Sequence, residues 1–449
     1  MPRKNLSKLF CEQNISTFHP AETVRKYLNK YQYGKYGIEK NFSSTKRAVV
    51  VIPCYSEFRN LPALLESLNL NSSGYLNETA FLFVINNSSE CAETVRKNNA
   101  DTLDFFREII SHPENRYGKL NIAIVDAATG NLAPPPKLAG VGLARKIGMD
   151  AALSLLGEEN FKEGIIVALD ADCTVSDNYL EEIFIAFSQN PEGFAIFNYE
   201  HTFSDDNGIN DAITAYEIFL RYYVLGLRFA NSHYALHTIG SAFACRPALY
   251  IKCEGMNKLK AGEDFYFIEK MAKQSGYKYI KEATVFPSPR PSKRVPFGTG
   301  RAVLNYLGEP EKRDLLYDPL IFSILKEWLK VYDEFTENPE AILCKASGIH
   351  NALGEFLKMN KFTEHWNKII RKAASGTQLT FQKKIWFDGF KTLKFVHYMR
   401  DTHFPNIPYS TACRNLLTLM DLRYPEAETQ VVNAENSKLS LLNLLRELT

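Results

Sequence analysis

The stretch from Gly164 to Asp172 is Gly-Ile-Ile-Val-Ala-Leu-Asp-Ala-Asp. A short apolar run rich in β-branched residues predicts a buried strand, and two carboxylates follow it directly. Three similar runs precede it, at residues 48–53, 79–85 and 121–126, with amphipathic helical patterns between them. Strands that alternate with helices predict an α/β fold with a mostly parallel sheet flanked by helices.

After about residue 305 the strand pattern gives way to helical periodicity. Two stripes with the spacing of one helix face are Ile321, Leu325, Trp328 and Tyr332, and Trp386, Phe390, Leu393 and His397. A chain of 449 residues also exceeds the roughly 250 to 300 residues at which single cores stop growing. We predict an N-terminal extension over residues 1–45, an α/β domain over 46–305 and a mainly helical C-terminal domain over 306–449.

Composition excludes several classes of protein. The net charge of +2 comes from 53 basic and 51 acidic side chains spread along the chain, which argues against a nucleic-acid binder. The start of the chain lacks the apolar run of a signal peptide, and the most apolar long stretch, 212–230, contains Glu217, Arg221 and Arg228. Eight cysteines without a CxxC spacing indicate neither a zinc ribbon nor a disulfide framework. We expect a cytoplasmic protein with no transmembrane segment, and peripheral contact at the inner membrane face stays open.

Polar residues follow the predicted strands where a ligand would bind. In open α/β sheets ligands lie at the carboxyl ends of the strands, and the residues there are Tyr55, Glu57, Asn86, Asp170 and Asp172. The two aspartates can hold Mn2+ or Mg2+, because these ions take one or two carboxylates together with phosphate oxygens. Solvated loop acids are the alternative interpretation.

Three further groups carry possible chemistry. Glu263 and Asp264 begin an apolar helix, where one carboxylate can act as a general base, although acids at a helix N-terminus are also favoured by the helix dipole alone. Arg145 follows two glycines and can point toward a nucleotide; the alternative is that this segment is a helix start packed on the sheet. The basic segment from Pro289 to Arg301, which includes Arg294, suits a loop that closes over phosphates or a solvated linker.

Taken in order, these elements resemble the family 2 glycosyltransferases, which have the GT-A nucleotide-diphospho-sugar transferase fold. The resemblance runs from about Arg47 to Arg301. It consists of an opening strand with a Pro-x-Tyr-Asn-Glu turn (Val49–Glu57, with Ser56 in place of Asn), an Ala-Arg-Asn-x-Gly helix (Gly140–Ala152, with Lys146 in place of Asn), an Asp-x-Asp motif (Leu169–Asp172), and an acceptor-side strand followed by a Glu-Asp motif (Gly240–Arg246, then Gly262–Asp264).

The resemblance implies a role for each matched residue. Pro53, Tyr55 and Glu57 would line the nucleotide pocket with Arg145 nearby, Asp170 would contact the ribose or the sugar, and Asp172 would bind the metal. Asp264 would be the general base and Glu263 would orient the acceptor. Asn86 stands where the family has an acid that binds the base, and its amide oxygen can still accept from a base N–H. Residues 284–287, Thr-Val-Phe-Pro, lack the histidine that many members use as a further metal ligand.

We therefore expect an inverting, metal-assisted glycosyltransferase that moves a sugar from a nucleotide diphosphate sugar to a hydroxyl of a carbohydrate or lipid-linked acceptor. A nucleotidyltransferase is one alternative, but it would normally have a glycine-rich loop with Arg and Lys after the first strand, whereas residues 54–58 are Cys-Tyr-Ser-Glu-Phe. A catalytically silent binding or scaffold protein of the same fold is the other. Failure to bind metal and donor would favour it.

Overall fold

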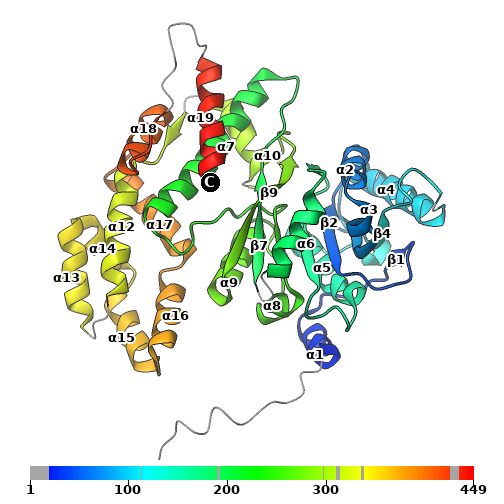
Figure 1. Cartoon of the computed structure of the whole chain (residues 1–449), viewed down its shortest axis with the longest axis horizontal. Coiled ribbons are helices and arrows are strands. Elements are labelled where there is room, and N and C mark those ends of the chain that lie inside the picture. Colours follow the sequence, from blue (N-terminus) through cyan, green and yellow to red (C-terminus); the bar gives the residue numbers. More distant parts are fainter. Residues whose placement is uncertain are drawn as a thin grey trace, which may run out of the picture.

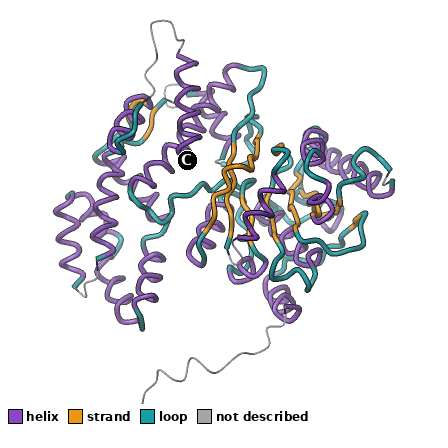
Figure 2. Tube along the Cα trace, viewed as in Figure 1, coloured by secondary structure: helices purple, strands orange, loops and turns teal. Residues whose placement is uncertain are grey.

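The structure, a computed structural model, describes residues 20–449 except 113, 190–192, 297, 310–313, 335–337 and 425–433. The first 19 residues of the predicted N-terminal extension lie outside the described residues. Figure 1 shows a sheet with helices on both faces and, beside it, a group of helices from the C-terminal part of the chain. Figure 2 shows the strands of the main sheet gathered in the first of these regions.

Among the described residues, nine strands form one sheet in the order β1-β4-β3-β2-β5-β8-β7-β9-β6. The long pairings of β2 with β3, β3 with β4 and β2 with β5 are parallel, whereas β8 runs antiparallel to both of its neighbours. The predicted mostly parallel sheet is thus confirmed. The strands are β1 (Glu39–Lys40), β2 (Ala48–Cys54), β3 (Thr79–Asn86), β4 (Asn121–Ala127), β5 (Ile165–Ala168), β6 (Cys173–Val175), β7 (Phe194–Tyr199), β8 (Phe243–Cys245) and β9 (Tyr277–Pro287).

Helices cover both faces of this sheet, which explains why its central strands are apolar throughout. All seven residues of β2 are buried, as expected for a parallel strand between two helical layers. Val50 and Ile52 face one core with α2, α4 and α6, and Val49 and Val51 face the other with α1, α5, α8 and α9. The helices of this region are α1 (Pro20–Tyr31), α2 (Leu61–Asn69), α3 (Ser73–Glu78), α4 (Glu93–Ser111), the 3-10 helix η2 (Gly130–Leu132), α5 (Val141–Leu156), α6 (Tyr179–Gln189), α8 (Pro247–Lys252) and α9 (Glu263–Gln274).

The C-terminal part is mainly helical, as predicted, and has a core of its own. This core contains the fully buried Trp328 and Trp366, together with Tyr222 and Leu225 from α7. Within the described ranges no helix is long and apolar enough to cross a membrane. The elements are α7 (Asn207–Phe229), α10 (Thr299–Gly308), β10 (Leu315–Leu316), α12 (Leu320–Asp333), α13 (Pro339–Ile349), α14 (Asn351–Met359), α15 (Phe362–Lys372), α16 (Gly376–Trp386), α17 (Gly389–Thr402), β11 (Ile407–Pro408), α18 (Tyr409–Leu419) and α19 (Ala434–Leu448).

The two helical stripes of this part have different outcomes. The stripe from Ile321 to Tyr332 is the buried face of α12, as predicted. The stripe from Trp386 to His397 was expected to lie on one helix, and this expectation is wrong. The helix breaks after Trp386, because the side chain of Asp388 accepts a hydrogen bond from the backbone N–H of Lys391 (2.9 Å) and caps a new helix.

Candidate active site

The turn after β2 brings Glu57 back to the edge of the sheet. Ser56 adopts the left-handed conformation (φ 57°), which side chains other than glycine rarely adopt. Its backbone N–H donates to Asn99 Oδ1 of α4 (2.9 Å), and the amide of Asn99 donates to Asn87 Oδ1 (2.8 Å). The turn after β2 is therefore tied to the end of β3 through one asparagine, and this fixes where the Glu57 side chain begins.

Arg145 joins two carboxylates from different elements. Its Nη2 donates to Asp170 Oδ1 (2.5 Å) after β5, and its Nη1 donates to Glu263 Oε1 at the start of α9. The Arg145 side chain is only 3 % exposed. A Cβ added to Gly240 would lie 2.6 Å from Arg145 Nη2, so the absence of a side chain at this position leaves room for the guanidinium.

The start of α9 is held against α5 by close backbone packing. A Cβ added to Gly142 would lie 2.2 Å from the carbonyl oxygen of Leu259 and 3.0 Å from Glu263 Cβ. Asn257 Nδ2 also donates to the carbonyl oxygen of Glu263 (3.1 Å). These contacts place the carboxylates of Glu263 and Asp264 at the same edge of the sheet as Asp170.

The basic segment lies across the remaining carboxylates. Arg290 donates to Glu57 Oε1 and forms an ion pair with Asp172 (Nη2 to Oδ2, 2.9 Å). Arg294 donates to the same Glu57 oxygen, and its guanidinium carbon lies 5.2 Å from the ring centroid of Tyr55. Glu57 after β2 thus meets arginines that lie more than 200 positions away in the sequence, and Arg290 also reaches Asp172 after β5.

Three of the acids have pKa values above their ordinary range. Burial raises the pKa of Asp172 to about 6, and the neighbouring carboxylates of Glu57 and Asp170 add to the effect. Burial also raises the pKa of Glu263 to about 7 despite the opposing charge of Arg145, and burial raises the pKa of Asp264 in the same way. Burial is the main cause for all three carboxyl groups and neighbouring acids add to it, so a proton or a cation at these groups would be favoured.

The remaining predicted residues lie around this cluster. Asp264 is next to Glu263, and its Oδ1 accepts a hydrogen bond from the backbone N–H of Phe265 (2.7 Å). Pro53 is inside β2, opposite Val84 of β3. Asn86 ends β3, and its buried Oδ1 has no hydrogen-bond partner in the part of the chain that the structure describes.

The structure adds residues that the sequence analysis did not single out. Arg290 contacts two of the acids, whereas only Arg294 of the same segment was named as a donor-site residue. Asn60 donates to Glu57 Oε2 (2.5 Å), and Asn99 holds the turn at Ser56. Arg290 could have been found from the sequence, because it belongs to a cluster of basic residues. Asn99 could not, because a single asparagine in a helical pattern does not indicate a function.

The side chains of the site provide only some of the ligands that a divalent cation needs. No group of three or more His, Cys, Asp and Glu side chains able to hold a metal occurs among the residues that the structure describes. Asp170 and Asp172 nevertheless provide two carboxylates, and the mutual repulsion of Glu57, Asp170 and Asp172 contributes to the raised pKa of Asp172. Such a pair suits Mg2+ or Mn2+ when diphosphate oxygens complete the coordination.

Comparisons with known proteins give similarity in structure alone. No family model and no curated protein matches the sequence. Among solved structures, S. aureus TarS 1-349 in complex with UDP-GlcNAc is 13% identical, with 76% of this chain and 90% of that chain covered and a TM-score of 0.38. The same fragment in complex with UDP has 13% identity, coverage of 89% and 90%, and a TM-score of 0.38.

A longer TarS structure is 14% identical over 54% of this chain, with a TM-score of 0.35, and this chain spans about a third (36%) of its length. The chain is similar in fold to these S. aureus TarS structures.

Proposed function

We propose that the protein is an inverting glycosyltransferase, which transfers a sugar from a nucleotide diphosphate sugar to an acceptor hydroxyl with the help of Mn2+ or Mg2+. The observation that carries the proposal is the meeting of acids and arginines from distant segments at one edge of the sheet. The acids are Glu57, Asp170, Asp172 and Glu263, and the arginines are Arg145, Arg290 and Arg294.

The arginines of the basic segment suit the diphosphate of the donor. Guanidinium groups bind phosphate through paired, charge-assisted hydrogen bonds. Arg290 and Arg294 are about one third exposed, so a bound diphosphate can reach them. Arg290 pairs with Glu57 and Asp172, and Arg294 pairs with Glu57. Binding of the donor would exchange these carboxylates for phosphate oxygens.

The base of the nucleotide would lie near the ends of β2 and β3. The unpaired Oδ1 of Asn86 can accept a hydrogen bond from a base N–H. A buried acceptor without a partner costs about 1–3 kcal/mol, so a ligand that supplies the donor recovers this energy. Tyr55 is partly exposed beside Arg294 and offers a ring face.

The metal would be held by Asp172 and Asp170 with oxygens of the diphosphate, and it would stabilise the negative charge of the leaving group. The arginines of the basic segment would also stabilise this charge. Since Arg145 holds Asp170 and Glu263 at fixed positions, it aligns the donor side of the site with the acceptor side.

Asp264 is the proposed general base. It takes the proton of the acceptor hydroxyl while that oxygen forms a bond to the anomeric carbon. The bond from this carbon to the diphosphate oxygen breaks, and the nucleoside diphosphate leaves with the electron pair. A single displacement of this kind inverts the anomeric carbon. The raised pKa of Asp264 makes it a stronger base.

Two substitutions separate the proposed roles. Asp172→Asn is expected to weaken metal-dependent binding of the donor, whereas Asp264→Asn is expected to retain binding and to lower the transfer rate by about 100-fold or more. Donor affinity is measured by calorimetry with Mn2+ and then with a chelator, and transfer is measured as release of nucleoside diphosphate.

Asp101→Asn is the matched control, because Asp101 is exposed on α4, and both its affinity and its rate should equal those of the wild type. Full transfer activity in Asp264→Asn would show that the base is another group.

A further inference from the structure

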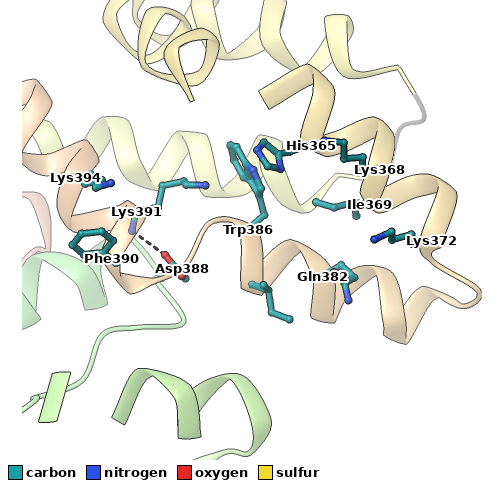
Figure 3. A pocket seen from close by; sticks show the side chains of 11 residues that line it. His365, Lys368, Ile369, Lys372, Gln382, Trp386, Asp388, Phe390, Lys391 and Lys394 are labelled. Carbon is teal, nitrogen blue, oxygen red and sulfur yellow. Dashed lines mark hydrogen bonds between the residues drawn. The ribbon is translucent and has the colours of Figure 1, made fainter. Parts of the chain in front are cut away.

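A second group of charged residues lines a pocket of about 490 Å³ in the C-terminal helices. It lies between α15, α16 and the start of α17, and Figure 3 shows its lysines on either side of Trp386. Its volume is in the range of small-molecule sites, which is about 300–1,000 Å³. No residue of the proposed donor site lines this pocket.

Four lysines line the pocket. Lys368 and Lys372 come from α15 and Lys391 and Lys394 from α17, one helical turn apart in each pair. Over the described ranges, none of these four ammonium groups has a carboxylate within ion-pair distance. Asp388 is the acid among the lining residues, and it is paired with Lys273 (2.7 Å). The charge of Lys394 acts against that of Lys391, and a bound anion would offset this repulsion.

An apolar and aromatic surface adjoins these charges. Trp386, Phe390, Ile369 and Ile385 line the same pocket. Lys391 Nζ lies 3.9 Å from the ring centroid of Trp386, and Lys394 Nζ lies 4.5 Å from that of Phe390. Burial lowers the pKa of Lys391, and the neighbouring Lys394 adds to this against the opposing charge of Asp388. A ligand with a ring and an anionic group would fit both kinds of surface.

The pocket adjoins the helix that begins with the proposed base. The backbone N–H of Phe390 donates to Glu269 Oε1 of α9 (2.9 Å), and the Phe390 ring lies 5.7 Å from that of Tyr266. Tyr266 is exposed and follows Asp264 by two residues. The basic pocket is thus in contact with α9, the helix whose first residues are Glu263 and Asp264.

We propose that this pocket binds a phosphate or carboxylate group of the acceptor, so that the acceptor is an anionic carbohydrate. This inference rests on the proposed function for the identity of the reaction. The expected ligand is a sugar ring that bears an anionic group. The experiment below distinguishes a phosphate from a carboxylate.

The test measures binding of glucose 1-phosphate, glucuronate and glucose to the full chain by calorimetry at low salt. Glucose 1-phosphate or glucuronate should bind and glucose should not, and the anion that binds identifies the acceptor group. Lys368→Gln combined with Lys391→Gln, one from each helix, should weaken this binding by about tenfold or more. Lys391→Arg keeps the charge and should retain binding.

The matched control combines Lys119→Gln with Lys162→Gln. Both lysines are exposed and lie away from the pocket, and the change of net charge is the same. Equal loss of binding in this control would overturn the proposal, because it would show an effect of overall charge. Binding to vesicles that contain anionic lipid, without binding to either soluble anionic sugar, would also overturn it.

Donor binding separates failure of this inference from failure of the proposed function. If a nucleotide sugar binds and neither anionic sugar does, the inference is wrong and the proposed function stands. If an anionic sugar binds through the lysines and no nucleotide sugar does, the role in acceptor binding is wrong. With donor present, the anionic sugar should speed release of nucleoside diphosphate in the wild type. It should not do so in the variant that combines Lys368→Gln with Lys391→Gln. Unchanged release in the wild type would overturn the acceptor role.

Discussion

At the scale of single residues, the candidate site depends on a buried guanidinium. Arg145 is the group that contacts both Asp170 and Glu263, and the three side chains come from a helix, a strand end and another helix. Removing one partner of a buried ion pair costs about 3–5 kcal/mol, because the remaining charge is left without compensation. The position of Arg145 therefore couples the geometry of the site to the stability of the domain.

Gly240→Ala tests this coupling without changing any charge. The new Cβ would lie 2.6 Å from Arg145 Nη2, and the guanidinium cannot move away without losing Asp170 or Glu263. We expect the free energy of unfolding to fall by about 1–3 kcal/mol and transfer activity to fall with it. Denaturant unfolding and release of nucleoside diphosphate measure the two effects.

Gly276→Ala is the control for this substitution. Gly276 is exposed, and an added Cβ would meet nothing within 4 Å. Its stability and activity should match those of the wild type. A Gly240→Ala variant that is as stable and as active as this control would show that Arg145 has more freedom than its contacts indicate.

At the scale of elements, the segment that follows β9 covers the ends of the strands. Its arginines contact acids after β2 and after β5, so one irregular segment spans the donor side of the site. Helix α10 follows it, and Thr299 Oγ1 at its start lies 3.3 Å from His201 Nε2. The segment is thus anchored beyond the arginines, whose side chains pair with Glu57 and Asp172 and are about one third exposed.

Arg290→Ala and Arg294→Ala should each weaken binding of the nucleotide sugar by about tenfold or more, because each removes a charge-assisted contact with phosphate. Lys293→Ala is the control, since Lys293 belongs to the same segment, is exposed, and has no ion pair within the described part of the chain. Calorimetric titration of the three variants measures the effect. Equal losses in all three would indicate a general electrostatic effect rather than specific contacts.

The sequence was sufficient to predict the four strands that begin the fold, but not the contacts that their residues make. Apolar runs located β2, β3, β4 and β5, because each strand is buried on both faces. The acids that end these strands were also predictable, since parallel strands present their carboxyl ends at one edge. The contact of Arg145 with Glu263 was not, because 118 residues separate them. The break at Asp388 was missed because a capping residue interrupts a helix without altering its apolar spacing.

At the scale of the whole molecule, α7 joins the two regions. It lies inside the predicted domain of residues 46–305, yet Tyr222 and Leu225 pack in the core of the C-terminal helices. Its Glu217 forms ion pairs with Arg221 and with Arg446 of α19. The described regions are therefore connected through a shared core, and the boundary at residue 305 stays a prediction.

Gly226→Ala tests the packing of α7 on α12. A Cβ added to Gly226 would lie 2.5 Å from the ring of Phe322, which is fully buried. We expect this overpacking to lower the free energy of unfolding by about 1–3 kcal/mol. Gly348→Ala is the matched control, because Gly348 is exposed in α13 and meets nothing within 4 Å. That change should instead stabilise the protein by about 0.5–1 kcal/mol.

The two glycine variants are compared by denaturant unfolding. Opposite signs are the expected result. A stabilising effect at both positions would mean that Phe322 is free to move and that α7 and α12 are not packed tightly.

The central claim is tested most directly by calorimetric binding of UDP, GDP, CDP and dTDP sugars, first with Mn2+ and then with a chelator. We expect one nucleotide sugar to bind in the presence of metal and to lose most of its affinity when the metal is removed. The absence of binding across the whole panel with Mn2+ present would contradict the assignment of the sheet edge as a donor site, and it would favour a silent protein of the same fold.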